Sequence, residues 1–246
     1  MAKYSSKDIV LLIDGYDVLG LTTTVTHSVE AMTEETTGFG DAAVEHTYLD
    51  LQKAELSQEG FFDDAAGATN EALNEKQGDD RVYCLGFEGN TIGKTFTGFK
   101  GALETKYDRI AARGTLHKAN ASYLGNGIVE DGKILHALTA RTAAGNTEAA
   151  GTRVDNGAAT ADGANAYLQV TALTLGGYTN VIIKVRESAD GTTWSDLETF
   201  TAVTAAQIAE RKIKAGAIKR YLAVSYSFTG AGADPSITFF VGLARN

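Results

Sequence analysis

Residues 8–26 read DIVLLIDGYDVLGLTTTVT, and this stretch indicates β-structure. The apolar run before Asp14 fits a buried strand, and Asp14-Gly15 is a dipeptide typical of two-residue hairpin turns. β-branched residues resume after the turn, as expected of a returning strand. The stretch therefore predicts a β-hairpin near the start of an antiparallel fold.

The composition agrees with a β-fold. The chain has 246 residues, of which 43% are hydrophobic, 27 are Gly and only one is proline. This length allows one large β domain or two smaller ones, and scarce proline suggests long strands closed by Gly, Asn and Asp turns. Strand patterns occur over residues 47–57, 81–88, 94–104, 108–117, 128–139, 166–175, 180–188, 196–203, 218–228 and 236–244.

Three segments lack a clear strand pattern. Residues 31–46 lose all periodicity, which predicts a long polar loop. Residues 65–77 are rich in Ala, Asn and Glu and predict a short helix of about three turns. Residues 205–213 fit either a helical turn or a strand.

A composition break divides the chain. Ala, Gly, Thr, Asn and Asp dominate residues 142–165, where Val154 is the only large apolar side chain. Such a segment is typical of a linker or exposed loop. We therefore expect one β domain over residues 1–141 and a C-terminal β domain over residues 166–246.

Charge is distributed unevenly along the chain. The net charge is −9, and residues 30–88 alone hold 15 acidic and 3 basic residues, a net −12. Residues 151–246 hold 8 acidic and 9 basic residues, a net +1. The excess of carboxylates argues against tight binding to a phosphate backbone, which needs clustered Lys and Arg. It allows an anionic surface that repels nucleic acid.

The sequence predicts neither a catalytic centre nor a metal site. Cys84, the only cysteine, lies in the apolar run VYCL and is expected to be a buried core thiol without a disulfide. The four histidines, at 27, 46, 117 and 136, lack metal-ligand spacing. We expect no enzyme activity, no cofactor and no metal.

Residues 89–95, GNTIGKT, resemble a phosphate-binding loop with the wrong spacing. The motif needs a glycine five positions before Gly93, where this chain has Glu88, whose carboxylate would face phosphate oxygens. Residues 96–101, FTGFKG, do not fit the helix that the motif requires. A β-turn is the favoured interpretation.

No membrane span or secretory signal is expected. No run of about 18 apolar residues occurs, and the first residues, MAKYSSKD, contain no apolar stretch. The expected setting is a reducing cytoplasm.

Four stretches carry a family resemblance. They are residues 8–17 (DIVLLIDGYD), 34–41 (EETTGFGD), 55–64 (ELSQEGFFDD) and 86–90 (GFEGN), with the predicted helix between the last two. In this layout, residues 1–140 resemble the major tail tube proteins of long-tailed, siphovirus-type bacteriophages. Residues 185–194 (VRESADGTTW) and 219–224 (KRYLAV) look like β modules common in phage virion proteins.

The resemblance implies a mostly β fold: a tail-tube-like β-sandwich or barrel with one short flanking α-helix, plus a C-terminal β-sandwich-like domain. That second domain would be an outer decoration or a second tube-like domain. Protomers would form a ring, either a hexamer or a trimer with pseudo-sixfold symmetry, and rings would stack into the conduit for DNA ejection. DNA would pass without specific binding. Partners would be further copies, the tape measure and the tail terminator, in a virion tail assembled in the host bacterial cytoplasm.

Two residue sets follow from this interpretation. The polar loop predicts an inter-ring stacking element, with candidates Glu34, Glu35, Thr36, Thr37, Phe39 and Asp41. The acidic segment predicts a lumen or interface lining, with candidates Glu45, Asp50, Glu55 and Glu59. The alternative for these acids is a solvated outer face.

A second function stays open at this point. A carbohydrate- or receptor-binding β module of a phage virion would use exposed aromatic rings, for which Trp194, Tyr221 and Tyr226 are candidates. Trp194, as the lone tryptophan of a β domain, is expected in the core instead.

Overall fold

The computed structural model describes residues 9–39, 42–125 and 129–246. Regular structure in these ranges is almost entirely antiparallel β-sheet, with one short α-helix, so the predicted mostly β fold class is confirmed. The elements are β1 (Val10–Ile13), β2 (Tyr16–Asp17), the 3-10 helix η2 (Leu19–Leu21), β3 (Thr22–Glu35), β4 (His46–Phe61), α1 (Thr69–Leu73), β5 (Asp80–Gly86), β6 (Thr95–Ile110), β7 (Lys118–Gly125), β8 (Val129–Arg141), β9 (Gly145–Asn146), β10 (Val154–Asp155), β11 (Ala164–Thr174), β12 (Asn180–Ser188), β13 (Ser195–Thr199), β14 (Ile208–Lys214), β15 (Tyr221–Thr229) and β16 (Ser236–Arg245).

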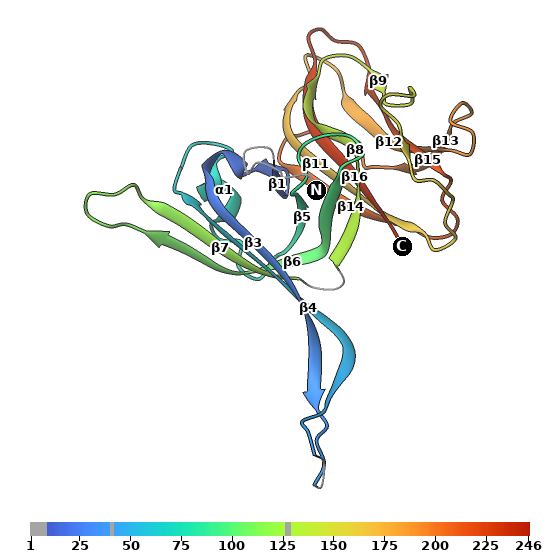
Figure 1. Cartoon of the computed structure of the whole chain (residues 1–246). Helices are drawn as coiled ribbons and strands as arrows, with labels where there is room; N and C mark the ends of the chain where they lie inside the picture. Colours follow the sequence, from blue (N-terminus) through green and yellow to red (C-terminus); the bar gives the residue numbers. More distant parts are fainter. Residues whose placement is uncertain (1–8, 40–41, 126–128) are drawn as a thin grey trace.

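The strands form two sheets within the described ranges. The larger sheet has the order β14-β11-β16-β8-β6-β5-β1-β2, and β7, β4 and β3 branch from it in that order at the C-terminal half of β6. The smaller sheet has the order β10-β15-β12-β13, with β9 also paired to β15. Figure 1 shows a C-terminal sandwich beside an N-terminal body, from which the β3–β4 hairpin projects as a long arm.

The C-terminal part is a β-sandwich. Its core lies between β11, β16 and β8 on one side and β12 and β15 on the other, with Leu168, Ile183, Val224 and Phe239 fully buried. Strand β12 shows why: Val181, Ile183 and Val185 alternate with less buried residues, because successive side chains of a strand point to opposite faces.

The N-terminal body packs around its own core. Leu11, Tyr83, Phe99 and Tyr123 are buried there, and α1 contributes Leu73. The predicted Asp14-Gly15 hairpin is confirmed, since β1 and β2 pair antiparallel and both turn residues have positive φ, 48° and 82°. Positive φ at both central positions is the geometry that favours Asp-Gly.

The larger sheet runs through the predicted domain boundary. Strand β8 pairs with β6 on one side and β16 on the other, so strands from both parts of the chain are neighbours. A third core cluster also spans both parts, with Phe96 packed edge-on against Tyr167 and Phe240. Independent folding of residues 1–141 and 166–246 stays a prediction.

Three local predictions are corrected. The expected loop over 31–46 is shorter than predicted, because β3 continues to Glu35 and β4 begins at His46. The helix is only Thr69–Leu73, and residues 108–117 are the end of β6 and a turn region rather than a separate strand.

Two further segments resolve as β-structure. Of residues 205–213, left open between helix and strand, residues 208–213 belong to β14. Residues 142–165, expected as linker or loop, contain β9 and β10, which both pair with β15, and the start of β11. Most of that segment is irregular, and only its short strands β9 and β10 are hydrogen-bonded to the smaller sheet.

Candidate assembly interface

Four strands of the N-terminal body form a layer with two unlike faces. Strands β3, β4, β7 and β6 pair in that order. One face packs on the N-terminal core through Leu56, Ala121 and Tyr123, which are at most 2% exposed. The opposite face carries the alternate residues of each strand and is open.

The open face is rich in hydroxyl and amide groups. Residues paired across the strands form rows on it, which follow from the strand registers. The rows are Thr24, Glu59, Asn120 and Asp108; Thr26, Ser57, Ser122 and Lys106; and Ser28, Glu55, Leu124 and Leu103. A shallow hollow of about 260 Å³ lies over the second and third rows.

Charge on this open face is sparse and mainly negative. Glu55 forms an ion pair with Lys53, and Asp108 pairs with Lys106 at 2.6 Å. Glu59 is exposed and forms no ion pair with any residue that the structure describes. The face therefore offers hydroxyl groups and a few carboxylates, a poor partner for a phosphate backbone.

The layer ends in two open edges. Among the described residues, β3 pairs with β4 alone along its whole length. Residues 105–110 of β6 pair with β7 on one side, while β5 and β8 pair with β6 only up to Leu103. Unpaired edge strands present backbone N–H and C=O groups that another chain can bind.

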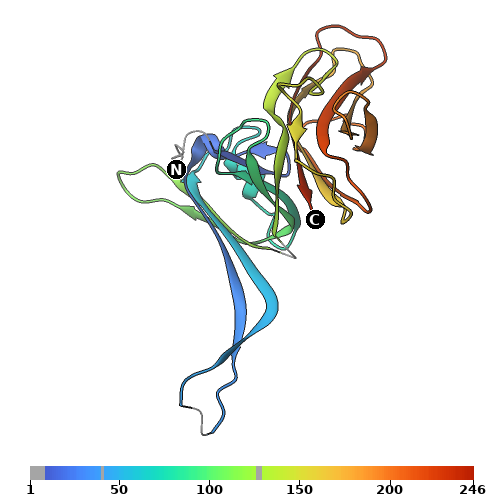
Figure 2. The same ribbon diagram turned by 45° about the vertical axis from the view of Figure 1, so that its right-hand side comes forward.

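The β3–β4 arm extends beyond the core (Figures 1 and 2). Its tip is closed by the Thr36 N–H donating to the Glu45 carbonyl at 2.9 Å, and the Glu45 N–H donating to Thr37 Oγ1 at 3.0 Å. Both faces of the arm are exposed, including the large apolar side chains of Val29, Met32, Phe39, Val44, Tyr48 and Leu49. Such a density of exposed apolar groups on a polar arm is typical of an interaction surface.

The structure places the predicted stacking residues at the end of this arm. Glu34 and Glu35 end β3, Thr36 and Thr37 begin the turn, and Phe39 is fully exposed. Asp41 lies outside the described residues. Their part in stacking stays a prediction.

The predicted acidic set is divided between two places. Glu55 and Glu59 lie on the open face, whereas Glu45 lies at the arm tip. Asp50 lies in β4, on the arm, and its side chain is not among those that the structure describes. Only two of the four acids therefore share a surface that could line a channel.

Sequence reasoning missed the inner half of β3 as the source of the open face. The signal was present: Thr24, Thr26 and Ser28 alternate with Val25 and other less exposed residues. It also missed the hairpin formed by the ends of β6 and β7, whose turn is marked by Gly114 at φ 81°.

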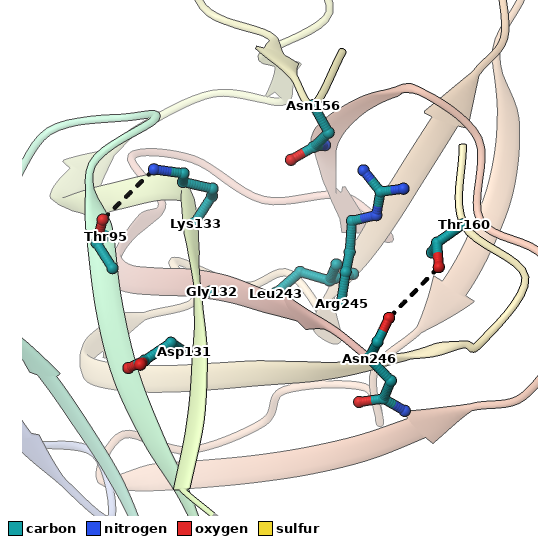
Figure 3. A pocket seen from close by; sticks show the side chains of 9 residues that line it. All are labelled: Thr95, Asp131, Gly132, Lys133, Asn156, Thr160, Leu243, Arg245 and Asn246. Carbon is teal, nitrogen blue, oxygen red and sulfur yellow. Dashed lines mark hydrogen bonds between the residues drawn. The ribbon is translucent and has the colours of Figure 1, made fainter. Parts of the chain in front are cut away.

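A separate pocket of about 430 Å³ lies where β6, β8 and β16 meet the connection to the smaller sheet (Figure 3). Lys133 donates to Thr95 Oγ1 at 3.4 Å, and Thr160 Oγ1 donates to the Asn246 carbonyl at 3.3 Å. Arg245 supplies a second cation. This polar hollow has room for water or a small anion.

The aromatic residues considered for carbohydrate binding do not share one free face. Tyr226 is buried, and Tyr221 is flanked by the guanidinium groups of Arg153 and Arg220, each 4.7 Å from its ring centroid. The expectation that Trp194 belongs to the core is wrong, since it is only half-buried in the loop before β13.

Two predictions are confirmed: Cys84 is a buried core thiol, and residues 89–95 form a turn rather than a phosphate-binding loop. Cys84 is fully buried, and burial raises the pKa of its thiol well above the usual range. In the phosphate-loop-like segment, Glu88 accepts a hydrogen bond from the Thr95 N–H at 3.0 Å, and β6 rather than a helix follows. Within the described ranges, no helix is long and apolar enough to span a membrane.

No family model and no curated protein matches the chain. Among solved structures it is similar to a chain in the virion of a native gene transfer agent particle, with 15% identity and a TM-score of 0.42 over 52% of this chain and 98% of that chain. A chain in the tail of an empty gene transfer agent particle with C6 symmetry gives 13% identity and a TM-score of 0.39 over 52% and 97%.

The Dit protein of phage SPP1, described as a paradigm of the hub adsorption apparatus in phages that infect Gram-positive bacteria, gives 13% identity and a TM-score of 0.35 over 96% of this chain and 99% of that chain. These three similar structures thus belong to virion, tail or adsorption assemblies. Because every TM-score lies below 0.5, neither a fold nor a function is transferred from them to this chain.

Proposed function

We propose that this chain is a structural protein of a phage-type tail, whose copies join into rings that stack to form a tube around a channel. The observation that carries the proposal is the four-stranded layer β3-β4-β7-β6. It has a packed face, an open polar face and an open strand edge at each end. A soluble monomer with two such edges is prone to edge-to-edge pairing, and a closed ring removes both.

Ring size can be bounded from strand spacing. With strands about 4.8 Å apart and tilted by about 40°, six four-stranded layers close a wall about 45–50 Å across at the backbone. Three such layers close one of only about 25 Å, which side chains would largely fill. A hexamer therefore suits a DNA conduit, and a trimer would need a second layer from the C-terminal part.

The open face is suited to line the channel. Its hydroxyl rows give DNA no strong contact, and Glu55 and Glu59 face the same side. Fixed negative charge repels a polyanion within about 8–10 Å at moderate salt. DNA would pass without specific binding and be ejected through this channel.

The proposal extends to location and partners. The protein would act in the virion tail after assembly in the host bacterial cytoplasm, next to a tape measure protein inside the tube and a tail terminator at its end. The role is structural rather than catalytic. This agrees with the buried thiol of Cys84 and the β-turn that replaces a phosphate loop at residues 89–95.

Negative-stain electron microscopy combined with sedimentation velocity tests the proposal. Purified protein at raised concentration is expected to form sixfold rings or tubes with an open centre. A monomer that persists up to millimolar concentration and across a range of salt would contradict it. A monomer that also binds glycans would favour the carbohydrate- or receptor-binding alternative.

A further inference from the structure

Two hairpins of the N-terminal body carry opposite charge. The arm, taken as residues 29–53, holds six acidic residues and one basic residue, a net −5. The hairpin formed by the ends of β6 and β7, residues 105–118, holds four basic residues and one acidic residue, a net +3; we refer to it as the basic hairpin. Residues 1–150 as a whole carry a net charge of −10, so this hairpin is positive within an acidic part of the chain.

The charges of both hairpins are available to a partner. Every described residue from Arg109 to Lys118 is exposed. Arg113 and Lys118 form no ion pair with any described residue, and Arg109 donates to the Asn74 side chain at 3.0 Å and lies 5.7 Å from the ring centroid of Tyr107. Likewise Glu34 and Glu35 at the arm tip are exposed, and neither carboxylate has an ion-pair partner among the described residues.

Apolar groups accompany the charges on both sides. Phe39 and Val44 are 112% and 64% exposed on the arm, and Leu116 and Ile110 are 70% and 44% exposed on the basic hairpin. Each hairpin thus combines exposed apolar side chains with charges mainly of one sign, as specific protein interfaces commonly do.

Among the described residues, the acidic arm and the basic hairpin of one chain do not contact each other. In both views the arm points away from the body in one direction and the basic hairpin in another (Figures 1 and 2). From Val29 to Phe39 the arm spans about 30 Å at about 3.3 Å per residue. Its reach therefore brings the tip to a neighbouring molecule rather than back to its own basic hairpin.

We propose that the arm of one protomer docks on the basic hairpin of a second copy of this chain. The contact is heterologous, because one surface meets a different surface of the partner, and between stacked rings, where it does not close on itself, it can repeat from one ring to the next. This inference rests on the proposed tube and assigns the surface that receives the arm. Complementary charge would set which surfaces meet and how fast, while Phe39 and Leu116 supply the buried apolar contact.

Charge reversal in both partners tests the docking. One variant, Glu34→Lys with Glu35→Lys, makes the arm tip positive; the other, Arg113→Glu with Lys118→Glu, makes the basic hairpin negative. Each variant alone should lose at least about tenfold in association constant, because like charges then face each other. A 1:1 mixture should recover association in alternating assemblies, because each reversed surface finds a complementary one.

Charge-conserving variants serve as matched controls. Glu34→Asp with Glu35→Asp, and Arg113→Lys with Lys118→Arg, alter the same sites and should associate as the wild type does. Sedimentation velocity is run at about 50 mM and about 500 mM salt, where the Debye length falls from about 14 Å to about 4 Å, so the difference between reversed and wild-type proteins should shrink at high salt. Thermal melts confirm that each variant is folded.

The outcomes separate this docking from the tube itself. Reversed variants that assemble as the wild type does, or a mixture of folded variants that fails to recover, overturn the docking while leaving wild-type rings intact. A wild type that never associates overturns both. Retention of the wild type on duplex DNA or anionic vesicles, lost in Arg113→Glu with Lys118→Glu while assembly is unchanged, would also overturn it and assign the basic hairpin to an anionic partner.

Discussion

The side chain of Gln169 is hydrogen-bonded to the backbone of Gly15, 154 residues earlier in the chain. Its Oε1 accepts from the Gly15 N–H at 2.5 Å, and its Nε2 donates to the Val82 carbonyl at 2.9 Å. Gln169 lies in β11 of the C-terminal part and is fully buried. One side-chain amide therefore satisfies the buried Gly15 N–H, adds a hydrogen bond to the Val82 carbonyl, which also accepts from the Asp14 N–H at 3.0 Å, and fixes the β1–β2 turn against β11.

Replacing Gln169 by Ala should destabilise the whole chain. The buried Gly15 N–H would lose its partner, at about 1–3 kcal/mol, whereas the Val82 carbonyl keeps its hydrogen bond from the Asp14 N–H and loses only its second one, at about 0.5–1.5 kcal/mol. Urea unfolding should show a loss of about 1.5–4.5 kcal/mol in the free energy of unfolding. Gln52→Ala, at an exposed position of the arm, is the matched control and should change it by less than about 0.5 kcal/mol. If Gln169→Ala leaves the free energy of unfolding unchanged, water replaces the hydrogen bonds of the amide.

Local sequence chemistry predicted the elements whose two faces differ. Strand β12 has the bounds expected from its alternation, 180–188, and the Asp14-Gly15 turn was found because only a few dipeptides tolerate its backbone. The loop predicted over 31–46 was too long for the same reason, since residues 31–35 belong to β3. The arm has no buried face, so Val29 and Met32 follow no inside-outside pattern that would mark a strand.

The contact between Gln169 and Gly15, and the open face of the β3-β4-β7-β6 layer, could not be predicted from the sequence. Nothing near Gln169 in the sequence indicates that its amide meets Gly15, because that contact depends on long-range pairing. Gly15 itself is needed there, since a Cβ would lie 2.7 Å from the Val170 carbonyl oxygen. The open face similarly joins Glu59, Asn120 and Asp108, which only strand register brings into one row.

His136 should make stability depend on pH. It is fully buried; its Nε2 accepts from Arg141 Nε at 3.0 Å, and the Nδ1–H donates to the Phe239 carbonyl at 3.2 Å. Burial, with the Arg141 charge second, lowers the His136 pKa from 6.5 to about 4. The unfolded state therefore takes up a proton that the folded state does not between these two values, and stability falls as pH falls through this window, by up to about 3 kcal/mol.

Urea unfolding at about pH 7 and about pH 4.5 tests this. His136→Gln removes the titrating group, so its stability should depend less on pH in that window than the wild type's, whatever its absolute stability. His117→Gln, at an exposed position on the basic hairpin, is the control and should keep the wild-type dependence. An unchanged pH dependence in His136→Gln would assign the loss to other groups.

Shortening the arm should separate folding from assembly. Glu35 and His46 are paired, so replacing residues 36–45 with Asn-Gly closes a two-residue hairpin in the existing register. None of the described residues among 36–45 belongs to the buried core, and the free energy of unfolding should stay within about 0.5 kcal/mol. Electron microscopy should then show rings that no longer stack. Normal tubes from the shortened chain would remove the arm tip from stacking, and a loss of folding would make it part of the domain.

The open face should keep duplex DNA off the channel wall, and two substitutions should reverse this. Glu30 and Glu59 are exposed and form no ion pair with a described residue, unlike Glu55 and Asp108, so they carry the free charge of this side of the layer. Replacing both with Lys changes the charge of the face by four in each protomer, and a ring repeats that change around the channel. Assembled wild-type protein should show no measurable DNA affinity at moderate salt in fluorescence anisotropy. Assembled Glu30→Lys with Glu59→Lys should bind, with an affinity that falls by about 0.9 log units per log unit of salt for each phosphate neutralised.

The position of the charge decides the interpretation of that experiment. Asp64 and Asp79 are exposed residues flanking α1, which packs on the core side of the same layer. Asp64→Lys with Asp79→Lys makes the same change in net charge away from the open face, and in an assembled tube it should leave DNA binding as weak as in the wild type. If both double variants bind DNA equally, net charge alone governs the interaction and the open face does not line a channel. If the wild type itself binds DNA tightly, the repulsive wall is wrong even in a protein that forms tubes.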